Sequence, residues 1–256
     1  MSNNLLSVKH ISKTFNANST QERKSLIDVS FDLNQGDFGV IVGGNGAGKS
    51  TLMNVISGKI LADEGSIILG NEDLTKLSEY KRAAKISRVH QNPALGTAPR
   101  MSIVQNLAIA YRRGKSRGLR ASIKSEDISI YKEHLKELGL GLEDRMETPI
   151  ELLSGGQRQA VALVMATLSE SELLLLDEHT AALDPHTQKL VMSLTDTLVK
   201  RYKLTALMIT HSLSDAIKYG NKLFILEEGK LKHKLDYEEK KTLTAEKLFI
   251  LMENNN

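Results

Sequence analysis

The segment with the clearest chemical signal is a glycine-rich stretch in the first fifth of the chain. Residues 43–51 read GGNGAGKST and directly follow an apolar, β-branched run, Asp37–Val42. They fit the pattern GxxxxGK[ST], in which glycines turn backbone N–H groups toward an anion. The helix expected from Lys49 presents the positive end of its dipole to the same anion, Lys49 can bridge the β- and γ-phosphates, and Ser50 can ligate Mg²⁺. The expected nucleotide-binding residues are Gly43, Gly44, Asn45, Gly46, Ala47, Gly48, Lys49, Ser50 and Thr51.

Two acidic residues at the end of another apolar run form the next candidate. Leu173–Leu176 predicts a buried strand, and Asp177 and Glu178 follow it directly. The carboxyl end of a parallel strand points into the crevice where ligands of such sheets bind. We therefore expect Asp177 to hold Mg²⁺, directly or through water, and Glu178 to polarise the attacking water. Taken alone, the segment also fits a strand end with two solvated acids.

The composition limits the class of protein. The chain has 256 residues, 41% of them hydrophobic and 25% charged, with no cysteine and a formal net charge of +3. Without cysteine, disulfides and thiolate metal sites are excluded, which suits a reducing cytosol. Residues 1–15 lack the apolar core of a signal peptide, and no run reaches the roughly 18–20 apolar residues of a membrane span. We therefore expect a soluble protein that reaches a membrane only through a partner, and the charge gives no reason to expect nucleic acid.

Strand and helix patterns alternate in the two outer parts of the chain. Strands are expected at Asp37–Val42, Ser66–Leu69, Ile86–Val89, Leu173–Leu176, Ala206–Thr210 and Lys222–Leu226. Helices are expected at Lys49–Ser57, His186–Arg201, Leu213–Tyr219 and, near the end, Leu243–Met252. This alternation predicts an α/β fold with a largely parallel sheet.

The middle of the chain has helical periodicity and hardly any strand signal. Met101–Arg112 and Asp127–Leu138 have the pattern of amphipathic helices, and Gln157–Leu168 that of a mostly buried one. We therefore expect a helical insert at residues 93–168, which divides an ATP-binding core into residues 1–92 and 169–256.

The motif LSGGQ, Leu153 to Gln157, separates the two chemical segments. With it the chain resembles the ATP-binding cassette (ABC) ATPases, whose signature has this sequence. Ser154 is a good helix N-cap and the two glycines expose N–H groups, so this is a second helix start suited to an anion. Further family motifs occur in order along nearly the whole chain: Phe15 for adenine stacking, Gln91 of the glutamine loop, Ala181–Asp184 of the D-loop and the switch histidine His211.

The resemblance implies a P-loop NTPase core with an N-terminal antiparallel β part and an inserted helical signature subdomain. It implies that ATP and Mg²⁺ are bound, that Glu178, His211, Lys49 and Gln91 act in hydrolysis, and that Ser50, Gln91 and Asp177 face the metal. Ser154, Gly155, Gly156 and Gln157 are expected to meet the γ-phosphate held by a second copy, in a head-to-tail dimer.

The same resemblance implies membrane partners. The chain is expected to be cytoplasmic, peripheral on the inner face of the cell membrane, and to drive separate permease subunits, with a solute-binding protein acting on the permease. Import is expected, and the segments GTAP, RRGKSRG and DEHTAALDP resemble a bacterial group thought to import aromatic amino acids or similar solutes. The alternatives are an exporter, a soluble ABC ATPase without a transport role, a kinase or GTPase of another P-loop class, and a regulatory module without turnover.

Several residues also have plainer interpretations. Phe15 could be a core aromatic, Gln91 a polar loop residue and His211 a buried or capping histidine. His179 stands where the family commonly has proline, and a structural substitution or a titrating role is open there. The basic run Arg112, Arg113, Lys115, Arg117, Arg120 and Lys124 is either a solvated loop or a contact with anionic lipid or an acidic permease surface.

Overall fold

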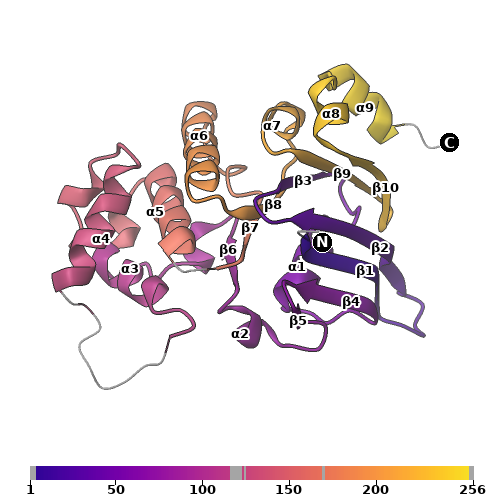
Figure 1. The fold of residues 1–256 in the computed structure, drawn as a ribbon, viewed down its shortest axis with the longest axis horizontal. Coiled ribbons are helices and arrows are strands. Elements are labelled where there is room, and N and C mark those ends of the chain that lie inside the picture. Colours follow the sequence, from indigo (N-terminus) through magenta and orange to yellow (C-terminus); the bar gives the residue numbers. More distant parts are fainter. Residues whose placement is uncertain (1–3, 116–122, 124, 169–170, 254–256) are drawn as a thin grey trace.

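A six-stranded sheet, mostly parallel, forms the centre of the molecule (Figure 1). The structure, a computed structural model, describes residues 4–115, 123, 125–168 and 171–253. The strand order is β10-β9-β3-β8-β7-β6, and only β10 runs antiparallel to its neighbour. The strands are β3 (Phe38–Val42), β6 (Ile86–Val89), β7 (Leu173–Asp177), β8 (Thr205–Ile209), β9 (Lys222–Glu227) and β10 (Lys230–Leu235). β3 and β8 are buried along their whole length, which is typical of parallel strands covered on both faces.

A second, antiparallel sheet of four strands has the order β2-β1-β4-β5. Its strands are β1 (Asn4–Phe15), β2 (Arg23–Asn34), β4 (Glu64–Leu69) and β5 (Glu72–Asp73). The prediction of a strand at Ser66–Leu69 is confirmed, but its expected place in the parallel sheet is wrong, because the strand pairs antiparallel with β1. A short apolar run has the same pattern in either kind of sheet, so only its partner strand decides the assignment.

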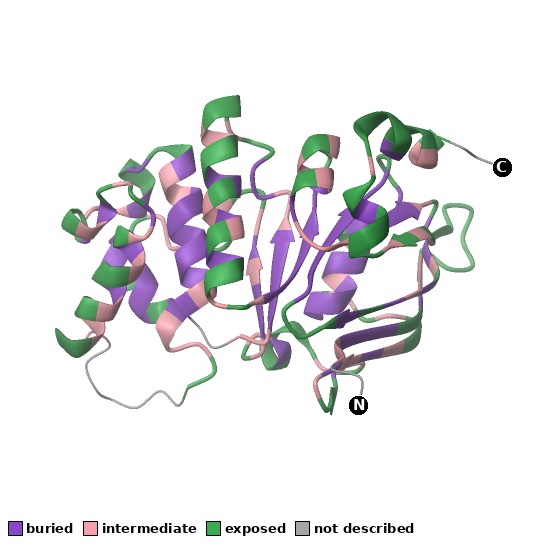
Figure 2. Cartoon of the chain, turned by 45° about the horizontal axis from the view of Figure 1, so that its top comes forward, coloured by how far each residue is buried: buried purple, intermediate pink, exposed green. Residues whose placement is uncertain are grey.

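Helix α1 (Lys49–Ser57) lies between the two sheets (Figure 1). One continuous apolar cluster joins Leu52 and Ile56 of α1 to Leu6 of β1, Ile67 of β4 and Leu175 of β7. The buried colour in Figure 2 runs through the central strands and along this helix. The helix that begins at the glycine-rich segment is thus fixed by packing on both sides.

The opposite face of the parallel sheet is covered by helices from the second half of the chain. Met192 and Leu198 of α6 and Ala216 of α7 pack there against Val40 and Met208. The helices are α6 (Pro185–Arg201), α7 (Leu213–Lys218), α8 (Tyr237–Lys241) and α9 (Ala245–Glu253). A short helix, α2 (Glu79–Arg82), lies on the side of the parallel sheet that α1 covers.

The helical middle of the chain forms a third apolar cluster, at one end of the molecule (Figure 1). The cluster is formed by α3 (Ile103–Tyr111), α4 (Ser125–Lys136), α5 (Gly155–Leu168) and the 3₁₀ turns η2 (Leu142–Asp144) and η3 (Ile150–Leu152). The 3₁₀ turn η1 (Pro93–Leu95) precedes them and has no buried residue. The Tyr202 hydroxyl, after α6, donates to Glu137 Oε1 at 2.8 Å. Burial and this hydrogen bond raise the pKa of Tyr202 to about 12, so the contact stays formed through the neutral pH range.

The basic run after α3 is only partly a solvated loop. Arg113 Nη1 donates to Ser87 Oγ at 2.9 Å, and Arg112 Nη2 lies 3.9 Å from Asp127. Arg113 therefore connects the helical insert to β6, whereas the Arg112–Asp127 pair joins the end of α3 to α4 within the insert. Arg117, Arg120 and Lys124 lie outside the described residues. No helix in the described parts of the chain is both long and apolar enough to cross a membrane.

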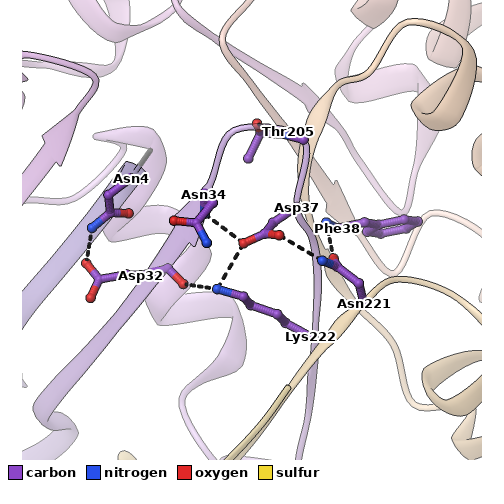
Figure 3. Close-up of polar contacts among 9 residues, drawn as sticks. Asn4, Asp32, Asn34, Asp37, Phe38, Thr205, Asn221 and Lys222 are labelled. Carbon is purple, nitrogen blue, oxygen red and sulfur yellow. Dashed lines mark hydrogen bonds and ion pairs between the residues drawn. The ribbon is translucent and has the colours of Figure 1, made fainter. Parts of the chain in front are cut away.

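A polar network closes the amino ends of β3 and β9 (Figure 3). The Asp37 carboxylate accepts from Asn221 Nδ2 at 2.7 Å and pairs with Lys222 Nζ at 2.9 Å. Burial works to raise the pKa of Asp37, but the hydrogen bonds from Asn221 and Lys222 outweigh it and the pKa is lowered. Asp37 is therefore a structural carboxylate, at the edge of the sheet opposite to Asp177 and Glu178.

His179 lies in the turn after β7, where its side chain is buried against α6. Its Nε2 is 2.9 Å from the hydroxyl of Thr195, and that hydroxyl donates to Val191 O at 2.8 Å. Because the Thr195 hydrogen is committed to Val191, the His179 ring is the donor, as a neutral imidazole protonated on Nε2. Burial lowers the pKa of His179 to about 4.

This buried histidine makes stability depend on pH. In the unfolded chain an ordinary histidine binds a proton near pH 6.5, so between about pH 6.5 and pH 4 the unfolded state holds more protons and stability falls as the pH falls. The stabilisation that depends on a neutral His179 is fully present above pH 6.5.

Between pH 7.5 and 5.0 we expect the wild-type free energy of unfolding to fall by about 2 kcal/mol more than that of His179→Gln. Urea unfolding at both pH values measures this, with His186→Gln, at an exposed position of α6, as the control. Equal pH dependence in wild type and His179→Gln would contradict it.

Candidate nucleotide-binding site

The carboxyl ends of four parallel strands bring the predicted site residues to one edge of the sheet. The glycine-rich segment follows β3, His211 follows β8, Glu178 follows β7 and Gln91 follows β6. Backbone hydrogen bonds hold the carboxyl ends of β3, β8 and β7 in register, since Thr210 N donates to Ile41 O at 3.3 Å and Glu178 N to Ile209 O at 3.1 Å. Residues more than a hundred positions apart in sequence are thereby fixed side by side.

The loop of residues 43–48 folds around the side chain of Lys49. Its Nζ donates to Gly43 O at 2.8 Å and to Gly44 O at 2.9 Å, and the residue is 5% exposed. Burial lowers the pKa of Lys49, opposed by the charge of Glu178. Gly48 has φ +104°, and a Cβ there would lie 2.4 Å from Ser25 O, so only glycine fits. The ammonium is thus held by two adjacent backbone carbonyls at the start of the loop.

Helix α1, which starts at Lys49, is anchored at its other end by Arg82. The Arg82 guanidinium, 1% exposed, donates to Val55 O and Ile56 O, both at 2.8 Å. These are carbonyls of the last turn of α1, where a cation complements the helix dipole. The end of the helix at the glycine-rich loop is therefore held in place by packing along the helix and by the Arg82 charge at its C-terminal end.

Glu178 and His211 form a direct pair. His211 Nε2 lies 2.6 Å from Glu178 Oε1, and the side chains are 45% and 15% exposed. Glu178 has φ +47°, a conformation that costs energy for a residue with a side chain and that is concentrated at functional sites. The half-exposed histidine rules out the interpretation of His211 as a buried structural group.

Asp177 is held by an arginine that the sequence did not suggest. Arg88 Nη2 is 2.5 Å from Asp177 Oδ2, and Arg88 Nη1 donates to Asn54 Oδ1 of α1 at 2.8 Å. Arg88 therefore connects β6, β7 and α1 beneath the site. A charged residue within a short, mostly buried strand, between Ser87 and Val89, is the signal that could have identified it.

The donors near the loop fit a magnesium ion that arrives with a nucleotide. Mg²⁺ in such sites takes one or two protein oxygen ligands and completes its shell with phosphate oxygens and water. Ser50 is exposed at the first turn of α1, and Asp177 supplies a carboxylate. Gln91 is exposed in the bend after β6, and the backbone O of His90 beside it accepts from Gln159 Nε2 of α5 at 3.1 Å.

One cavity unites the loop with the acid–histidine pair. It measures about 290 Å³ and is open to solvent. Its lining residues are Arg23, Asn45, Gly46, Ala47, Gly48, Lys49, Ser50, Thr51, Glu178 and His211. Thr51 is partly engaged, because its hydroxyl is 2.8 Å from that of Ser25. Phe15, the last residue of β1, is 36% exposed and so is no core aromatic.

The LSGGQ segment lies apart from this cavity. Ser154 Oγ accepts from Gln157 N at 3.3 Å and Gln157 Oε1 accepts from Ser154 N at 3.2 Å, which is a capping box. Helix α5 consequently begins at Gly155, two residues before the expected Gln157. A Cβ on Gly156 would lie 2.1 Å from Thr187 Cγ2, so this glycine lets α5 pack against the start of α6. Ser154 is exposed to solvent, as the residues of the expected D-loop largely are.

Comparisons with known proteins agree with this geometry. Residues 26–181 match the family model described as ABC transporter. A tyrosine transport ATP-binding protein of Clostridioides difficile (strain R20291) is 40% identical over 95% of this chain and 97% of its own.

Solved ABC cassettes have the same fold over nearly the whole chain. A dimeric ATP-binding cassette in a post-hydrolysis state, bound to ADP and Pi, is 26% identical with a TM-score of 0.77, covering 91% of this chain and 99% of that one. CbiO1 of Clostridium perfringens, part of the ABC transporter complex cbiONQ, is 25% identical with a TM-score of 0.76, covering 93% and 90%. The chain belongs to the ABC transporter ATP-binding family, whose members are ATP hydrolases.

Proposed function

We propose that this chain powers a transporter by binding ATP between two copies of itself and hydrolysing it. The observation that carries the proposal is the single cavity in which the phosphate-binding loop, Lys49, Glu178 and His211 meet. In each copy that cavity is open, and in each copy the start of α5 is exposed. Two copies arranged head to tail would cover both, which excludes water and strengthens the electrostatics of the site.

Within the site the roles follow from the contacts. Lys49 exchanges its two loop carbonyls for phosphate oxygens, so a buried cation gains anionic partners. Glu178 orients and deprotonates the attacking water as the γ-phosphate leaves, and His211, at 2.6 Å, holds that carboxylate in place. Ser50 and Asp177, with Gln91, would hold Mg²⁺, which neutralises charge on the transferred phosphate when bound.

Communication with a membrane partner would run through the glutamine loop. Leu95, four residues after Gln91, is 71% exposed, and Tyr80, before β6, is 89% exposed. Large exposed apolar side chains are suited to a protein contact. We propose that permease subunits dock here, which would place the chain at the cytoplasmic face of a membrane. The hydrogen bond from Gln159 to His90 O then passes movement of this loop to α5.

The dimer is tested by separating closure from hydrolysis. Glu178→Gln should lower the rate of hydrolysis by about 10²–10⁴-fold, because the water is no longer activated, and should accumulate an ATP-bound dimer in size-exclusion chromatography with Mg-ATP. Adding Ser154→Arg to that variant should return it to monomer while its ATP affinity is retained, since Ser154 meets the nucleotide of the other copy. The control is Glu178→Gln with Ser129→Arg, an exposed serine of α4, which should still dimerise. A double variant with Ser154→Arg that still elutes as a dimer would refute the arrangement.

For the transported solute, we propose uptake of tyrosine or a related aromatic amino acid. The support is the 40% identity to a tyrosine transport ATP-binding protein across 95% of this chain. A separate permease and a solute-binding protein would select the solute.

Reconstitution with the permease and binding protein in liposomes checks the solute and the direction. Tyrosine should stimulate ATP hydrolysis severalfold and should move toward the face that carries the ATPase, whereas leucine and glutamate should do neither. Because solute selection lies outside this chain, Glu178→Gln should abolish transport of tyrosine without changing its binding to the solute-binding protein. Stimulation by an unrelated solute, with none by aromatic amino acids, would refute the proposed substrate class.

A further inference from the structure

Arg23 is a basic residue in the phosphate cavity to which no family motif assigns a role. It is the first residue of β2 and pairs across the antiparallel sheet with Phe15, the last residue of β1. Residues directly opposite each other on antiparallel strands carry neighbouring side chains on one face. Arg23 is thus beside the aromatic ring expected to hold the base.

The same arginine also reaches the glycine-rich loop. Arg23 Nη2 donates to Gly46 O at 3.1 Å. Ser25, two residues further along β2, is bonded to Thr51 at the start of α1. The beginning of β2 therefore lies along the loop, and Arg23 occupies the interval between Phe15 and the groups that surround Lys49.

The charge of Arg23 is not compensated by a neighbouring acid. The side chain is exposed, and within the described residues its guanidinium forms no ion pair, its hydrogen bond being to a neutral carbonyl. A guanidinium presents several donors in a planar fork that matches the oxygens of a phosphate. An anion in this part of the cavity would therefore gain a cationic partner whose charge no neighbouring acid already neutralises.

We propose that Arg23 binds the α-phosphate of the bound nucleotide. The inference rests on the proposed placement of the nucleotide, with its base at Phe15 and its terminal phosphates at Lys49. A nucleotide that extends from Phe15 to Lys49 would bring its α-phosphate, the one bonded to the ribose, to Arg23. Lys49 and the loop amides hold the β- and γ-phosphates, whereas Arg23 adds a contact that ATP, ADP and AMP share.

The competing explanation is that Arg23 only supports the loop through Gly46 O. The two explanations differ in which ligands they affect. Loss of loop support weakens ligands that carry a β-phosphate and leaves AMP nearly unchanged. Loss of an α-phosphate contact weakens ATP, ADP and AMP by the same factor and leaves adenosine unchanged.

Equilibrium binding to the full chain, by competition with a fluorescent ATP analogue, tests the proposal. Arg23→Gln should bind ATP, ADP and AMP roughly tenfold more weakly than wild type, because one charge-assisted hydrogen bond is lost. Arg23→Lys should recover most of the loss, since it restores a cation. Lys24→Gln is the matched control, an exposed lysine at the next position of β2, and should bind like wild type. The affinity of Arg23→Gln for ATP should also depend less on salt.

Each outcome bears on one claim. If Arg23→Gln retains AMP affinity while ATP and ADP weaken, or if all three are unchanged, the α-phosphate contact is refuted. If wild type itself fails to bind nucleotide, the proposed function fails with it. Unchanged thermal unfolding of Arg23→Gln establishes that the loss is not one of folding.

Discussion

The register of β3, β8 and β7 at their carboxyl ends is the constraint on which the site depends. The hydrogen bonds Thr210 N to Ile41 O and Glu178 N to Ile209 O set the spacing of the loop, His211 and Glu178 before any ligand is present. These strands are fully or almost fully buried, and alternate residues pack in different apolar clusters on the two faces, so a shift by one residue would exchange side chains between the clusters and disrupt the packing of both. The chemistry is therefore positioned by the most rigid part of the molecule, which is what a preorganised electrostatic site requires.

The charges around the cavity are held by partners that can be exchanged. Lys49 is bound to neutral carbonyls, Arg23 to another carbonyl, and Glu178 to a histidine that is half exposed. In contrast, Asp177 is held by Arg88, a nearly buried side chain bound also to Asn54. Cations with replaceable partners are available to an anion at low cost, whereas a firmly held carboxylate keeps its orientation.

The sequence predicted the local features of the site better than its long-range contacts. The glycine loop and the acids after Leu176 depend on adjacent residues, so the motif and the apolar run before it were enough, and the helix start at LSGGQ was predicted to within two residues. The fold class was also predicted, because most strands of the central sheet are continuous apolar runs.

The features that were not predicted depend on contacts between residues that are far apart in the sequence. β10 alternates exposed and half-buried residues, KLKHKL, and has no apolar run to reveal it. β2 contains a positive φ at Asp28 and several register shifts against β1, which break the period of two. The place of Arg23 opposite Phe15 follows only from that irregular register. The His179–Thr195 contact likewise requires the rotation of α6 about its axis, which no pattern of residues fixes.

Helix α5 gives a physical reason why an event at the glutamine loop would reach the partner copy. Its residues Val161 and Val164 lie in the core of the helical insert, whereas Leu163 and Ala166 pack with the cluster on the parallel sheet. Its first turn contacts α6 at Gly156, and Gln159 holds the backbone beside Gln91. A close-packed helix moves as a unit because its interior cannot be compressed. A displacement of the loop at Gln91 by a permease would therefore displace the exposed Ser154 end as well, and that end is where the second nucleotide is proposed to bind.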